Sequence, residues 1–137
     1  MTQALILAAI EKRLATLTPA MPTAGENSTY TPVTGTAYQS LQYVGEVKDS
    51  PGVTNDSWTR IDGIYQVTLC YPSGTGAVAA RTRADLVSNH FKRGTVLIES
   101  GIKVQFNAQP QINAPLTPTG WYCLPVRLFY TVVKNSQ

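Results

Sequence analysis

Two segments of the chain repeat apolar residues at helical spacing. The first, residues 3–17, has apolar positions at intervals of three and four, and Pro19 and Pro22 follow it. These positions are Leu7, Ile10, Leu14 and Leu17. The second segment, residues 77–91, repeats the spacing at Ala80, Ala84, Val87 and Phe91. We therefore expect two amphipathic helices, the second with an alanine-rich stripe that can lie close to a sheet.

Longer stretches alternate apolar and polar residues as β-strands do. Residues 58–71 and 122–132 keep a period of two over most of their length, and residues 38–44 alternate with weaker contrast. Pro125 interrupts the last of the predicted strands with a residue that has no N–H for the ladder. Its presence indicates a sheet edge, a bulge or a strand end at that point.

Shorter strands complete the pattern. A hairpin is expected from residue 96 to residue 108, with its turn at Ser100 and Gly101, and a short edge strand is expected around residues 26–30. The order of helix, strands, helix and strands predicts an α+β fold, in which two α-helices pack on one face of a mostly antiparallel β-sheet. We expect residues 1–137 to form a single domain.

Residues 45–57, with the sequence GEVKDSPGVTNDS, contain mainly turn-forming and polar residues. Such a segment buries too little apolar surface to order itself, so it predicts a long exposed loop. Loops of about 12 residues or more in a compact domain are often functional. We expect this one to be mobile in the free protein and to become ordered on a partner.

The composition favours contacts with protein over contacts with nucleic acid or membrane. Charged residues make up 14% of the 137 residues, against a usual value of about 25%. The net charge of +3 is too small to demand a polyanionic partner. No apolar run reaches the roughly 18 residues that a transmembrane helix needs. The apolar run near the N-terminus lacks the flanks of a signal peptide, so we expect synthesis in the cytoplasm.

Candidate catalytic and metal-binding groups are sparse. His90 is the only histidine, and its place near a helix end favours a capping role. Cys70 and Cys123 are too far apart in sequence for a zinc motif, and without a secretion signal we expect free thiols. The eight carboxylates do not pair along any predicted element. The sequence therefore predicts no catalytic, cofactor or metal site.

Three segments resemble the tail terminator, or tail completion, proteins of long-tailed bacteriophages and prophages. They are MTQALILAAIEKRLATLTPAMPTAGEN, GIYQVTLCYPSGTGAVAARTRADLVSNHFKRG and GWYCLPVRLFYTVV. The resemblance implies a structural, non-enzymatic virion protein, assembled in the host cytoplasm and located at the head-proximal end of the tail. It implies a homo-oligomeric ring, expected to be hexameric, that caps the tail tube, ends tube polymerisation and offers a surface to the head-tail connector. DNA would pass through the lumen without sequence-specific binding.

The resemblance transfers no site residues, so candidate interface residues come from the chain itself. They lie in or beside residues 45–57 and on the second helix, where we expect them to be exposed. These candidates are Asp49, Asp56, Trp58, Arg60, Arg81 and Arg83. Trp58 suits either the rim of the core or an interface anchor.

Two alternative functions are open at this point. The chain could be an adaptor of the head-tail connector, because small α+β neck proteins can share this architecture. It could also be a small hydrolase that uses His90 with a cysteine or a carboxylate. A single histidine without a visible partner is a weak basis for catalysis.

Overall fold

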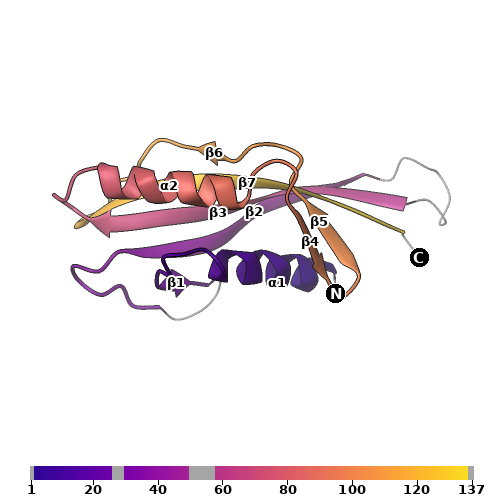
Figure 1. Ribbon diagram of the computed structural model, residues 1–137, viewed down its shortest axis with the longest axis horizontal. Helices are drawn as coiled ribbons and strands as arrows, with labels where there is room; N and C mark the ends of the chain where they lie inside the picture. Colours follow the sequence, from indigo (N-terminus) through magenta and orange to yellow (C-terminus); the bar gives the residue numbers. More distant parts are fainter. Residues whose placement is uncertain (1, 26–29, 50–57, 136–137) are drawn as a thin grey trace.

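The computed structural model describes residues 2–25, 30–49 and 58–135 (Figure 1). It has two helices and seven strands in these ranges. In chain order they are α1 (Thr2–Ala15), β1 (Thr23–Ala24), β2 (Tyr38–Asp49), β3 (Trp58–Pro72), α2 (Val78–His90), β4 (Val96–Glu99), β5 (Ile102–Gln105), β6 (Gln111–Ile112) and β7 (Trp121–Asn135). The α+β class predicted from the sequence is confirmed.

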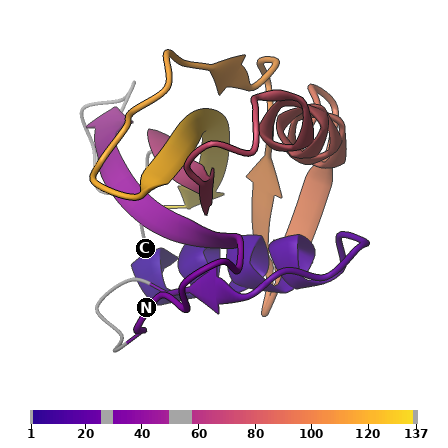
Figure 2. The same ribbon diagram turned by 90° about the vertical axis from the view of Figure 1, so that its left-hand side faces the viewer.

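A single curled sheet organises the described chain. Its strands follow the order β1-β2-β3-β7-β5-β4, and β6 pairs with β7 beside β5. All neighbours are antiparallel except β1 and β2. Figure 2 shows the curl, with the two helices beside different parts of the sheet. Helix α1 contacts β4 and β5, whereas α2 contacts β3 and β7.

Alternation along the two longest strands gives the sheet one core face. Tyr65 and Val67 of β3 lie beside Leu128 and Val126 of β7, and all four side chains are buried. Both helices contribute to the same hydrophobic cluster. Their contributions are Ile6, Ala9, Ile10 and Leu14 from α1, Ala84 and Val87 from α2, and Phe91 directly after α2. Burial of this shared apolar surface holds the helices on the sheet.

The predicted helices are confirmed with small changes. Helix α1 ends at Ala15, ahead of Pro19, and Ile6 is fully buried while Leu7 is only half-buried. Leu17 is buried just beyond the helix. All four residues of the second predicted stripe are fully buried. Ala80, Ala84 and Val87 lie in α2, and Phe91 follows its last residue.

Two predictions about strands need correction. Strand β2 continues to Asp49 and pairs with β3, so residues 45–49 of the expected loop are strand. The register shifts between Tyr43 and Gly45, which places a bulge at Val44. The remaining residues of that loop, 50–57, lie outside the described residues. The short edge strand lies at Thr23–Ala24, and most of the range expected for it, 26–29, is also outside the description.

Pro125 lies in the middle of β7 without breaking the β3 ladder. Its carbonyl accepts a hydrogen bond of 2.9 Å from the backbone N–H of Asn113, on the side away from β3. In an antiparallel strand the N–H and C=O of one residue face the same neighbour. The missing N–H therefore faces the chain that follows β6, where the regular pairing of β7 is already interrupted.

The two cysteines correct the prediction of free thiols. Cys70 of β3 and Cys123 of β7 are directly opposite in the register and form a disulfide. The expectation of free thiols came from the cellular compartment, whereas the bond follows from the strand register that brings the two residues together. The cross-link closes a span of 53 residues, for which loop entropy predicts a stabilisation of about 4 kcal/mol.

The disulfide predicts the alkylation pattern of the purified protein. Unfolded in denaturant without reductant, the chain should take up no iodoacetamide, and after reduction it should take up two equivalents. Reduction should also lower the melting temperature, because the unfolded chain gains conformational freedom. Mass spectrometry of protein prepared in air measures the uptake, and two alkyl groups without reduction would contradict the cross-link.

Candidate interaction surface

The sheet extends beyond both helices as a three-stranded arm (Figure 1). The arm consists of residues 45–49 of β2, 58–64 of β3 and 129–135 of β7, which pair side by side. Two residues of opposite charge are neighbours on adjacent strands of the arm, because Asp49 of β2 is the register partner of Arg60 of β3. Arg60 donates from Nε to the Asp62 carboxylate, with a shortest N–O distance of 3.0 Å.

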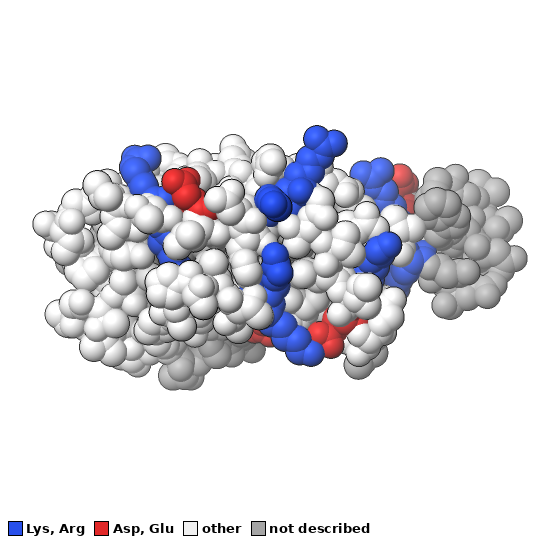
Figure 3. All heavy atoms as spheres, in the orientation of Figure 1, with Lys and Arg blue, Asp and Glu red and all other residues white. Residues whose placement is uncertain are grey.

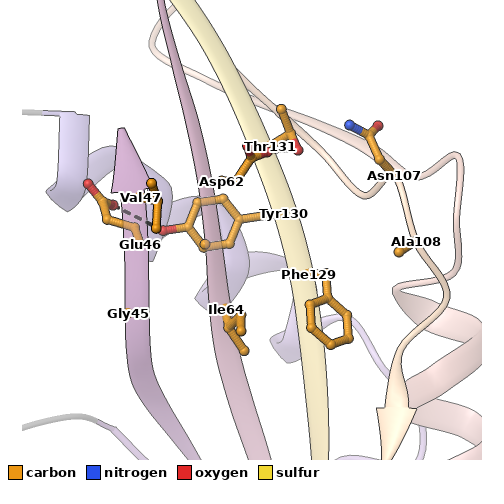
Figure 4. Close-up of a pocket in the computed structure, with 11 residues that line it drawn as sticks. Gly45, Glu46, Val47, Asp62, Ile64, Asn107, Ala108, Phe129, Tyr130 and Thr131 are labelled. Atoms are coloured by element: carbon orange, nitrogen blue, oxygen red, sulfur yellow. Dashed lines mark hydrogen bonds between the residues drawn. The ribbon is translucent and has the colours of Figure 1, made fainter. Parts of the chain in front are cut away.

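A tyrosine lies across the inner face of the arm. Tyr130 of β7 is the register partner of Gly63 of β3, and its ring covers that glycine. Its hydroxyl donates to Glu46 Oε1 of β2 at 3.1 Å (Figure 4). Burial, and next the negative charge of Glu46, raise the pKa of Tyr130, so the phenol stays protonated and remains a donor. The contact links the outer two strands over the middle one.

The Glu46 carboxylate also gathers polar groups from α1 and β2. The side-chain amide of Gln3 donates to Oε1, and Lys48 Nζ lies 3.8 Å from Oε2. The Glu46 side chain is only 8% exposed. A buried carboxylate is costly without hydrogen bonds, and these donors meet that need. Glu46 therefore holds the arm to the first turn of α1.

An apolar groove lies on the arm. Its volume is about 610 Å³, and residues 107 and 108, which follow β5, form one side. Ile64 and Phe129, neighbours in the register, lie side by side in it (Figure 4). Asp62 and Thr131 form the next row, joined by a 2.6 Å hydrogen bond from the threonine hydroxyl. The groove suits apolar side chains of a protein partner.

The two arginines of α2, which the sequence analysis treated alike, differ in exposure. Arg81 is exposed, as predicted, but Arg83 is only 4% exposed, so its assignment as an exposed interface residue is wrong. Arg83 donates from Nη2 to Gln39 Oε1 at 3.2 Å and from Nη1 to the carbonyl of Pro19. Burial lowers its pKa from the ordinary value. Arg83 thus connects α2 through hydrogen bonds to β2 and to the chain after α1.

The other candidates fall in two places. Asp49 and Arg60 are exposed at the end of the arm, and Trp58 begins β3 beside them. Arg81 is on α2, outside the arm. Asp56 lies outside the described residues. Sequence reasoning missed Val47, Ile64, Phe129 and Tyr130, because only the register shows that they are neighbours.

His90 joins the ends of the two helices. Its Nε2 donates to the carbonyl of Arg13 at 2.7 Å and lies 2.9 Å from the Thr16 hydroxyl. In return, the guanidinium of Arg13 donates twice to the carbonyl of His90, at 3.0 and 3.1 Å. Each side chain thus caps the other helix. Burial lowers the pKa of His90, which favours the neutral ring, and the capping role expected from the sequence is confirmed.

The disulfide removes one of the two partners that the hydrolase alternative offered to His90. Both cysteines are in the disulfide, so neither supplies a thiolate. Within residues 2–25, 30–49 and 58–135, no group of three or more His, Cys, Asp and Glu side chains could hold a metal ion. No helix in these ranges is long and apolar enough to cross a membrane.

Charge is thinly spread over the face of the molecule that is shown in Figure 3. Figure 3 shows Lys and Arg separated by broad uncharged areas, with fewer acidic groups between them. Such a surface gives a partner little long-range attraction and leaves recognition to shape and apolar contact. The fold and the groove together describe a small α+β protein with an apolar groove on its sheet.

Comparison with known proteins identifies the family. Residues 5–130 match the model of the phage tail terminator protein, and the chain belongs to this family. It is therefore a structural component of a phage tail. A protein of solved structure, whose designation states no function, is 27% identical with a TM-score of 0.70, covering 96% of each chain. No curated protein matches the chain.

Gly63 should be intolerant of a side chain. A Cβ atom there would lie 2.3 Å from the ring of Tyr130, so Gly63→Ala should lower the free energy of unfolding by about 1–3 kcal/mol. Gly45→Ala on the neighbouring strand is the matched control, because nothing lies within 4 Å of its added Cβ. Urea unfolding measures both, and equal stabilities would contradict the described arm.

The two arginines of α2 should respond differently to alanine. Arg83→Ala leaves the Gln39 and Pro19 oxygens without their donor and should cost about 2–4 kcal/mol. Arg81→Ala removes only an exposed side chain and should stay within about 0.5 kcal/mol of the wild type. Thermal and urea unfolding compare the stabilities of the two variants with that of the wild type. An Arg83→Ala protein with the stability of the wild type would show that these buried hydrogen bonds do not stabilise the fold.

Proposed function

We propose that this protein forms a hexameric ring on the head-proximal end of the phage tail tube. The ring ends tube polymerisation and then offers a surface to the head-tail connector. The family match over residues 5–130 is the observation that carries this proposal. Assembly takes place in the host cytoplasm, and DNA passes through the lumen without sequence-specific contacts.

The arm supports contact with other virion proteins. It carries an apolar groove, and the exposed Asp49 and Arg60 lie next to residues 50–57. Ring closure needs contacts in which one patch meets a different patch on the neighbour. In this subunit the groove and the helices lie on different parts of one sheet. They therefore offer two different patches for the contact between neighbouring subunits. We propose residues 50–57 as a contact with the tube or the connector.

Deletion of the gene from its phage or prophage distinguishes capping from joining. A terminator should be needed for length control, so tails made without it should vary in length and often exceed the normal length. The wild-type gene supplied in trans should restore uniform tails. Electron microscopy of induced lysates measures the length distribution.

Two further results define the outcome. Normal-length tails that fail to join heads would contradict the capping role and favour the connector adaptor. A variant with a short Gly-Ser segment in place of residues 50–57 tests the proposed contact. It should keep the thermal unfolding of the wild type and fail to restore tail length, and full restoration would exclude this segment.

A further inference from the structure

The curled sheet has an open edge at each end. Strand β1 pairs with β2 only at Gln39 and Ser40, and within the described residues no strand pairs with the outer edge of β2 from Glu46 to Asp49. Strand β4 is the last strand at the opposite end. Open edges present unpaired backbone donors and acceptors, which natural proteins usually cover or pair.

Strand β4 presents an apolar edge. The turn at Ser100 and Gly101, with φ angles of 48° and 85°, is of the tight two-residue hairpin type. In such a hairpin Glu99 bonds to Ile102, and by alternation the backbone groups of Ile98 and Val96 point outward. Both side chains are exposed, Ile98 at 73% and Val96 at 46%.

Strand β2 offers a matching edge. The register places the backbone groups of Val47 and Asp49 toward β3, so those of Glu46 and Lys48 point outward. The Val47 side chain is 71% exposed and lines the apolar groove. Its face is the face opposite the core, because its register partner Asp62 alternates with the buried Ile61.

The side chains beside the two edges are complementary in charge. Lys103, the register partner of Ile98, is exposed on the same face as that isoleucine. Asp49 is exposed on the same face as Val47. If the edges met, Lys103 would lie about two strand spacings, roughly 10 Å, from β2 of the neighbour, within reach of its long side chain. In a parallel pairing Ile98, whose backbone groups point outward, lies opposite Val47, whose backbone groups point to β3, so Val96 and Ile98 would extend the apolar floor that begins at Val47.

We propose that β4 of one subunit pairs in parallel with the 46–49 edge of β2 on the next, so that one sheet runs from subunit to subunit. The occupant of each edge is a second copy of this chain. The two edges are different surfaces, so the contact is head-to-tail and can close a ring. The inference rests on the ring of the proposed function and identifies the contact that closes it.

A backbone substitution tests the pairing. Ile98→Pro removes an outward N–H and leaves the bonds of β4 to β5 in place, whereas Ile98→Thr keeps the N–H and the β-branched shape. Sedimentation velocity over a concentration series measures assembly of the full chain. The proline variant should need about tenfold higher concentration, or more, for half-assembly, while the threonine variant should stay closer to the wild type.

Charge reversal gives a second test that does not depend on proline. Lys103→Glu and Asp49→Lys should each weaken assembly, and the double variant should recover it. If the wild type forms rings and both Ile98→Pro and Lys103→Glu assemble as well as it does, the edge pairing is wrong and the ring stands. Rings that form normally in Ile98→Pro but no longer bind tail tubes would assign the β4 edge to the tube. A wild-type monomer at every concentration would overturn both proposals.

Discussion

The antiparallel pairing of β3 with β7 is the constraint on which the rest of the structure depends. The ladder runs from Trp58 opposite Asn135 to Pro72 opposite Trp121, and it is closed near one end by the disulfide. Every other strand pairs with one of these two or with a strand that does. The alternation of the ladder supplies the apolar face that α2 contacts, and its buried side chains belong to the hydrophobic cluster that α1 shares. Loss of this register would turn buried side chains to the opposite face.

The ladder also determines where the molecule is open. Beyond the helices the same two strands continue into the arm, where β2 joins them and the Tyr130 to Glu46 hydrogen bond spans all three. The arm carries the apolar groove on a surface with few charges. In the proposed ring a subunit meets copies of itself and other virion proteins, and the hydrogen bond across the arm favours one shape of the groove. Preorganisation of this kind lowers the entropic cost of assembly.

Local patterns predicted the elements whose side chains enter the core. Period two identified β3 and β7, and helical spacing identified α1 and α2, because a buried face repeats with the geometry of its element. Residues 45–49 were missed because their strand conformation comes from backbone pairing with a distant segment, and their composition resembles that of a turn. The groove was missed for the same reason, since it needs the register, whereas the disulfide was missed because free thiols were expected in the cytoplasm. Arg83 left a readable signal: it lies three residues after Ala80 and four before Val87, on the buried stripe of α2.

The most direct test of this account is the native mass of the purified wild-type protein over a range of concentrations, with negative-stain images of any large species. The account predicts a six-subunit ring with an open channel wide enough for duplex DNA. A species that remains a monomer at every concentration would contradict it.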